Sequence, residues 1–188
     1  MIESFFLINF FSQSLENNYW VANLGDSRTI ILESVPFGDW VKPIDPALVT
    51  NTDLGLRFST TDHKPSAEKT RIIKTGHNVI SGRIDCSLSV SRSFGDFRYK
   101  NNPNFGPDQQ AVIATPEVSK ISKCENDEFI VLGCDGIFGN ILCNKEMTIA
   151  IRSKCAEIGD MVEAAKEILH LSLKRSSLDN MTVLIIKL

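Results

Sequence analysis

Short apolar blocks separated by turn residues dominate the hydrophobic pattern of this chain. Blocks of four to eight apolar residues bounded by Gly, Pro, Asp, Asn or Ser are typical of buried strands. Two such blocks flank the turn at 25–28 and predict a hairpin. The segment 34–56 predicts a loop or insertion, and 101–110 predicts a polar loop. The predicted strands are residues 5–11, 19–24, 29–32, 79–84, 88–90, 129–132 and 181–188.

Helical signals occur in three segments, at residues 66–75, 144–156 and 160–174. The third is the best defined, because Asp160 can cap its first turn and Glu163 follows at the capping-box spacing. Its apolar stripe, which we expect to contact the core, consists of Met161, Ala165, Ile168, Leu169 and Leu173. Strands and helices come in blocks and do not alternate regularly. This order favours an α+β fold with antiparallel sheets.

Composition and charge exclude several classes of protein. The 188 residues are 43% apolar, enough for one domain with a real core. The net charge of −3 argues against nucleic-acid binding through bulk positive charge. No apolar run is long enough to predict a membrane span. The five cysteines form no CxxC pair, which indicates reduced thiols and an intracellular, cytoplasmic location.

Three carboxylates lie where predicted strands meet turns. Asp26 and Asp135 each follow an apolar block, and Asp179 precedes the last one. If the fold aligns these strand ends, the three side chains form a rim of oxygen donors suited to Mg²⁺ or Mn²⁺. Each acid on its own also fits an ordinary turn, so position alone leaves both interpretations open.

Five motifs in a fixed order resemble the protein phosphatase 2C (PPM) family of metal-dependent serine/threonine phosphatases. They read YWVANLGDSR (19–28), STTDHKP (59–65), LSVSRSFGD (88–96), DEFIVLGCDGIF (127–138) and DNMT (179–182). The resemblance implies an α-β-β-α sandwich of two antiparallel sheets flanked by helices. It also implies a protein phosphoserine or phosphothreonine substrate.

The same resemblance implies roles for individual residues. Asp135 and Asp179 would be ligands of Mg²⁺ or Mn²⁺, and Asp26 would serve a weaker metal site shared with Asp135. The segment 64–83 would form a variable flap beside the substrate cleft. For His63 a structural hydrogen bond is favoured over acid–base chemistry, and for Arg92 and Asp96 an internal salt bridge is favoured. The residues expected to support the site are Gly136, Asn180, His63, Arg92 and Asp96.

The sequence also departs from the family pattern. The family has an N-terminal D-G-H-G-G turn whose Asp bridges two metals, an E-D pair and a phosphate-binding Arg, and none is found here. Before Asp26 the only acids are Glu3 and Glu16, with no Arg or His. Gly139 replaces the second Asp of the family's D-G-x-W-D motif. Too little negative charge would then remain to hold two dications close together.

These departures leave two hypotheses. Residues 19–188 would be the C-terminal part of a phosphatase domain, incomplete on its N-terminal side, and the apolar segment 1–18 would be a substitute strand or a docking segment. Either residues outside this chain complete an active enzyme, or the chain is an inactive phosphatase-like module that binds partners or serves as a structural subunit. We expect the chain alone to be inactive and another protein chain to cover its incomplete side.

Overall fold

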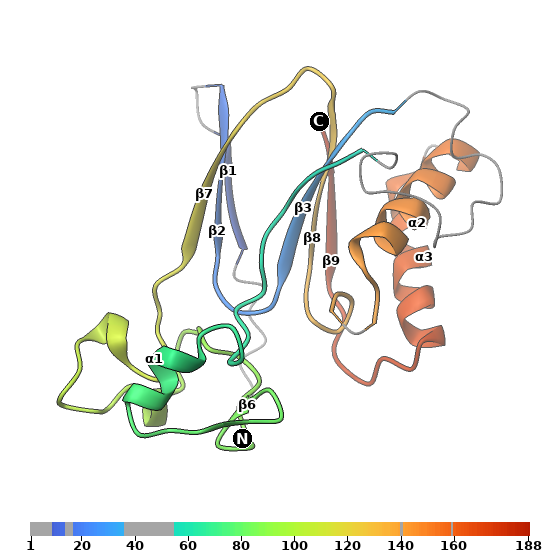
Figure 1. Cartoon of the computed structure of the whole chain (residues 1–188). Coiled ribbons are helices and arrows are strands. Elements are labelled where there is room, and N and C mark those ends of the chain that lie inside the picture. The colour runs from blue at the N-terminus through green and yellow to red at the C-terminus, as the bar shows by residue number, and fades with distance from the viewer. Residues whose placement is uncertain (1–8, 14–16, 36–54, 140, 159) are drawn as a thin grey trace.

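Two antiparallel sheets lie face to face, and two helices cover the outer side of one of them (Figure 1). The computed structural model describes residues 9–13, 17–35, 55–139, 141–158 and 160–188. Strands and helices are segregated, so the predicted α+β class with antiparallel sheets is confirmed. The outer helices and the paired sheets form three of the four layers that the α-β-β-α prediction names.

The four-stranded sheet, in the order β4-β3-β8-β9, is the buried centre of the molecule. Its members are β3 (Arg28–Glu33), β4 (Leu56–Ser59), β8 (Asp127–Gly133) and β9 (Val183–Lys187). One face, through Ile30, Leu32 and Phe129, packs on the helices, and the other packs on the second sheet. The central residues of β3 and β8 form continuous apolar runs, as expected for strands that are covered on both faces.

The second sheet has three strands in the order β1-β2-β7. They are β1 (Asn9–Gln13), β2 (Asn18–Asn23) and β7 (Glu117–Ser122). On β2, Tyr19 and Val21 are buried while Trp20 between them is 38% exposed. Tyr19 packs against Ile31 and Ile130 of the other sheet, so this alternation marks one covered face.

The predicted hairpin at 19–32 is wrong. The two strands enter different sheets: β2 pairs with β1 and β7, whereas β3 pairs with β4 and β8. Gly25, in the left-handed region at φ +96°, starts the crossing. Its N–H donates to His63 Nδ1 and its carbonyl accepts from the His63 N–H, so the turn is bonded to a distant segment and not to itself.

Helices α2 (Asn144–Ile158) and α3 (Met161–Lys174) confirm the two C-terminal helix predictions. The Asp160 carboxylate accepts a hydrogen bond from the Val162 N–H at 2.8 Å, which is the expected N-cap. Of the predicted apolar stripe, Met161, Ile168 and Leu169 pack on the core as expected. The fully buried row of α3 is Ala164, Ile168 and Ser172. Leu173, the last residue of the predicted stripe, is 54% exposed.

Residues 60–116, which we call the lobe, extend from one end of the sandwich (Figure 1). The lobe contains the α-helix α1 (Lys69–Lys74), the two-residue strands β5 (Val79–Ile80) and β6 (Arg83–Ile84), and the 3-10 helices η1 (Phe97–Tyr99) and η2 (Pro107–Gln109). Its own small core consists of Ile72, Ile84, Tyr99, Ala111 and Val112.

Several predicted boundaries need correction. The strand predicted at 79–84 is a tight hairpin, because Ser81 and Gly82 adopt positive φ. Only Leu88 of the strand predicted at 88–90 makes a bridge, to Ile84. The apolar pattern does not predict β4 or β7, since β4 is very short and β7 is largely polar. Most of the loop predicted at 34–56 and the first part of the strand predicted at 5–11 lie outside the described residues.

None of the described helices is long and apolar enough to cross a membrane. The five cysteines are free thiols.

Candidate metal site

Asp135 and Asp179 lie on two loops that are joined by close backbone contacts. A Cβ at Gly136 would lie 2.2 Å from the Asn180 carbonyl oxygen, so only glycine permits this approach. The Ser177 hydroxyl donates to the Gly136 carbonyl at 2.7 Å and closes the other side of the contact. The loop after β8 and the loop before β9 therefore form one unit, which carries both predicted metal ligands.

Cys134 is part of the same connection. Its N–H donates to the Thr182 carbonyl, and its sulfur accepts from the Thr182 N–H, both at 3.2 Å. The thiol also contacts the Asn180 carbonyl oxygen at 3.2 Å. Through these contacts Cys134 has a structural role, because it links the loop after β8 to the loop before β9.

Asp26 lies at the crossing between the two sheets, where the GDSR motif meets the DHKP motif. Three contacts join the two motifs. Gly25 bonds His63, Asp26 pairs with Lys64, and Arg28 donates two bonds to the Asp62 carboxylate at 3.0 and 2.8 Å. The Arg28 guanidinium also lies 5.1 Å from the centre of the Phe138 ring, just beyond Asp135 in the chain.

The three carboxylates influence one another electrostatically. Burial, together with the negative charges of Asp26 and Asp179, raises the pKa of Asp135 to about 6, against the opposing effect of Lys64. Asp26 and Asp179 therefore lie close enough to Asp135 for their charges to raise its pKa. A raised carboxyl pKa in such a cluster is typical of functional sites.

The donor type fits Mg²⁺ or Mn²⁺, but the arrangement does not close around an ion. Among the described residues, no group of three or more His, Cys, Asp or Glu side chains could hold a metal ion. Asp179 is exposed, and one oxygen of Asp26 is already bound by the Lys64 ammonium. Lys64 is thus a residue of the site that the carboxylate pattern misses.

His63 makes a structural hydrogen bond, as the sequence favours. Its Nδ1 accepts from the Gly25 N–H, so the imidazole is neutral and carries its proton on Nε2. Burial lowers the pKa of His63, and Arg92 lowers it further, while Glu68 and Glu117 oppose the shift. The ring therefore fixes the Asp26 turn from the lobe side.

Arg92 forms an internal ion pair, with Glu68 at 2.6 Å. The salt bridge predicted for Asp96 is wrong: among the described residues its carboxylate forms no ion pair and accepts from the Ser93 hydroxyl at 2.6 Å. Burial would raise the pKa of the Glu68 carboxyl, but hydrogen bonds from the Arg92 and Arg71 guanidiniums outweigh it and hold the pKa at about 2. Both supporting residues thus stabilise the lobe, and Glu68 is a partner that the motif pattern does not point to.

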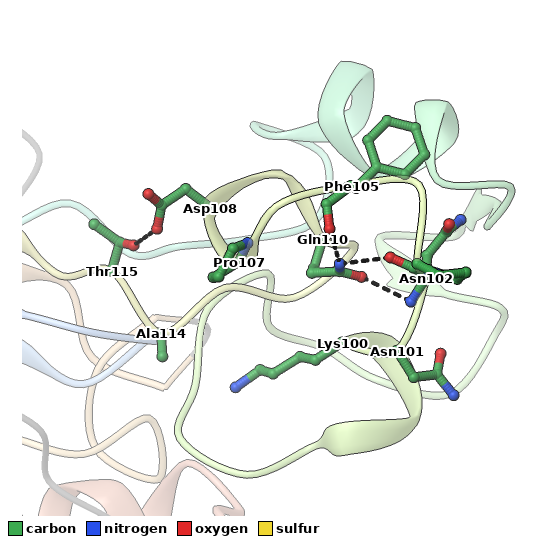
Figure 2. Close-up of a pocket in the computed structure, with 10 residues that line it drawn as sticks. Lys100, Asn101, Asn102, Phe105, Pro107, Asp108, Gln110, Ala114 and Thr115 are labelled. Carbon is green, nitrogen blue, oxygen red and sulfur yellow. Dashed lines mark hydrogen bonds between the residues drawn. The ribbon is translucent and has the colours of Figure 1, made fainter.

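A separate open pocket of about 530 Å³ lies within the lobe. Figure 2 shows Gln110 bonded to Asn102, and Thr115 bonded to Asp108 at 2.5 Å. Burial lowers the pKa of Lys100, whose Nζ donates to the Ser93 carbonyl. None of the three candidate metal ligands lines this pocket. Its lining consists of Lys100, Asn101, Asn102, Pro103, Phe105, Pro107, Asp108, Gln110, Ala114 and Thr115.

Comparison with known proteins agrees with the motif order. The profile of the family described as "Protein phosphatase 2C" matches residues 13–181. The chain belongs to the protein phosphatase 2C family. Within that family, protein phosphatase ppm-1.A of Caenorhabditis elegans is 33% identical over 172 residues, which are 90% of this chain and 32% of that protein. Protein phosphatase 1A of Homo sapiens is 40% identical over 134 residues, which are 70% of this chain and 35% of that protein.

The protein phosphatase 2C fold is also found by structural comparison: serine-threonine phosphatase 2C of Toxoplasma gondii matches with a TM-score of 0.62 at 20% identity, over 92% of this chain and 55% of that one. A crystal structure of a phosphatase from a pathogenic strain of Toxoplasma gondii matches with a TM-score of 0.74 at 28% identity, over 91% of this chain and 50% of that one. The chain spans about a third of the length of the curated relatives above.

Proposed function

We propose that this chain carries the later, carboxylate-bearing part of a protein phosphatase 2C active site. Asp135 and Asp179 would hold Mg²⁺ or Mn²⁺, Asp26 would serve a weaker position beside Asp135, and the substrate would be phosphoserine or phosphothreonine in a protein. The observation that carries this proposal is the Gly136–Asn180 contact, which brings the two ligand loops so close that a side chain at position 136 would overlap the Asn180 backbone.

Metal-dependent phosphoester hydrolysis, the chemistry of the family, defines the roles that Asp135 and its neighbours would have. A bound Mg²⁺ or Mn²⁺ would lower the pKa of a water molecule and neutralise charge on the phosphoryl oxygens. In this chain Asp135 would supply the anionic charge, which a bound cation would favour, because burial and two neighbouring acids raise its pKa to about 6 in the absence of metal. Cys134 and Gly136 hold the loop that orients it. In hydrolysis, water attacks phosphorus directly while the serine or threonine oxygen leaves and takes up a proton.

Within the proposal, turnover requires groups that these 188 residues lack. The sequence contains no D-G-H-G-G turn, and Gly139 replaces an expected acid. The bridging carboxylate and the phosphate-binding Arg would come from residues outside this chain, on the same polypeptide or on another. We therefore expect the chain by itself to bind a single cation weakly and to be inactive.

The alternative function is a phosphatase-like module that binds a partner or serves as a structural subunit. The observation that favours it is the outer face of the β1-β2-β7 sheet, where Trp20 is 38% and Val118 is 57% exposed. Another protein chain covering this face would make the sandwich complete. In that case Asp26, Asp135 and Asp179 would be turn residues or hold one weak cation.

Phosphopeptide turnover and Mn²⁺ binding test whether Asp135 belongs to a metal site, which the active-site proposal requires and the partner-binding module does not. The chain is assayed with Mn²⁺ alongside Asp135→Asn, and with Asp108→Asn as the matched control in the lobe pocket. Mn²⁺ binding that is lost only in Asp135→Asn would support the metal site, with or without turnover. Turnover that persists in Asp135→Asn, or the absence of Mn²⁺ binding in every variant, would contradict it.

A further inference from the structure

The Lys64 ammonium is the one cation that the structure places directly on a predicted metal ligand, within the described residues. Its Nζ lies 2.5 Å from Asp26 Oδ2. The Asp26 side chain is only 13% exposed, so the pair lies partly out of solvent, and screening by water is reduced. Lys64 also acts beyond Asp26, because its charge lowers the pKa of Asp135.

The position of Lys64 is fixed by its neighbours on both sides. Asp62 is held by two hydrogen bonds from Arg28, and His63 is held by Gly25 through both its backbone and its ring. Pro65, the next residue, is buried. The backbone that carries the ammonium is therefore anchored to the same turn that carries Asp26, so the ion pair belongs to the architecture of the site.

An ammonium and a divalent cation repel each other and need the same oxygens. The Lys64 ammonium contacts Asp26 and also lowers the pKa of Asp135, and the oxygen that it holds is on the acid that the family resemblance assigns to the weaker metal position. A cation that approaches Asp26 must therefore break the Lys64 pair or bind beside a positive charge.

We propose that Lys64 is a built-in counter-ion of Asp26 that a divalent cation must displace, so that the Lys64–Asp26 pair sets the metal affinity of this site. The inference rests on the proposed function, since it assumes that a cation binds there. It adds Lys64 to the site and gives a mechanism that regulates metal binding. The Lys64 ammonium neutralises Asp26 until a divalent cation displaces it.

Calorimetric titration with Mn²⁺ alone, without substrate, tests this inference. Lys64→Gln should bind Mn²⁺ at least about fivefold more tightly than the wild-type chain, because the competing charge is gone. Lys64→Arg keeps the charge and should remain within about twofold of wild type. The matched control is Lys69→Gln on the exposed start of α1, which removes the same charge away from Asp26 and should also change affinity by less than about twofold.

Each outcome is decisive. Tighter binding in Lys64→Gln alone supports the inference, and Lys64→Met provides a second neutral variant if circular dichroism shows Lys64→Gln to be misfolded. Equal or weaker binding in both neutral variants would overturn the role of Lys64 but leave the metal site intact. If Mn²⁺ binds to none of the proteins, the proposed metal site fails, and the role of Lys64 fails with it.

Discussion

The two sheets of the sandwich differ in how their faces are covered. In the four-stranded sheet, β3 and β8 are buried along almost their whole length, between the other sheet on one side and α2 and α3 on the other. In the three-stranded sheet, β7 alternates between exposed and half-buried positions, and Trp20 of β2 faces outward. The chain therefore builds one sheet that is packed on both sides and one that is packed on one side.

This difference coincides with the placement of the candidate site. Asp135 follows β8 and Asp179 precedes β9, so both come from neighbouring strands of the sheet that is packed on both sides. Asp26 lies at the crossing into that sheet from β2. A rigid, doubly covered sheet can hold acidic side chains near one another against their repulsion, which a sheet packed on one side is less able to do.

Removing a large side chain from the doubly packed sheet should have the largest effect. Phe129 on β8 is 1% exposed and belongs to the core that joins the sheet to the helices. Phe129→Ala should lower the free energy of unfolding by about 3–5 kcal/mol, measured by urea denaturation. Phe97→Ala, at a side chain that is 79% exposed, is the matched control and should change it by less than about 0.5 kcal/mol. Similar losses in both would mean that the core does not lie where the structure places it.

The contact between the ligand loops should give the next largest effect. A methyl group at Gly136 would overlap the Asn180 carbonyl, so Gly136→Ala should cost about 1–3 kcal/mol of stability and push the Asp135 and Asp179 loops apart. Gly106→Ala is the control, because a Cβ there meets no atom within 4 Å. Thermal unfolding of both variants measures the difference. Equal melting temperatures would show that the loops are not packed as closely as described.

The repulsion among the acids predicts a substitution that stabilises the protein. A carboxyl whose pKa is higher in the folded than in the unfolded state lowers the free energy of unfolding as pH rises. For Asp135 this loss of stability occurs between pH 3.8 and about 6. The shift corresponds to at most about 3 kcal/mol, and solvent screening of this partly buried group should leave about 1 kcal/mol. Without metal at pH 7, Asp135→Asn should therefore unfold at a higher temperature than wild type.

The pH dependence of that gain is its internal control. Below about pH 3 the wild-type Asp135 is largely protonated in both the folded and the unfolded state, so the advantage of Asp135→Asn should vanish there. A gain from Asp135→Asn that is the same at both pH values would trace to packing and not to charge.

The sequence pattern predicts this architecture in part, and its failures have a common cause. It identifies β8, β9, the two long helices and the Asp160 cap, because apolar runs and capping residues act locally. It fails on the β2–β3 pairing, because β3 finds its partner β8 about a hundred residues later, a preference that local turn residues do not encode.

The same limit applies to the site. Strand ends and motifs indicate Asp26, Asp135 and Asp179, but the Lys64 partner of Asp26 is 38 residues away in the chain, and the Glu68 partner of Arg92 is 24 away. Such pairs depend on how the lobe folds back onto the sandwich. The motif of Asp62, His63 and Lys64 indicates these contacts only when it is considered together with the Gly25–Arg28 turn that it contacts.

The smallest expected effect tests the outer face of the three-stranded sheet with one substitution made at two places. Val131→Ala, at a fully buried position of β8, should cost about 2–3 kcal/mol, whereas Val118→Ala, at a 57% exposed position of β7, should cost less than about 0.5 kcal/mol. Urea denaturation of both variants at several protein concentrations measures the contrast.

A loss of more than about 1 kcal/mol in Val118→Ala that grows with protein concentration would show that this face is covered by a second chain in solution. The two sheets would then both be packed on two sides, the outer face would be an interface, and the alternative function as a binding module would gain its first direct support.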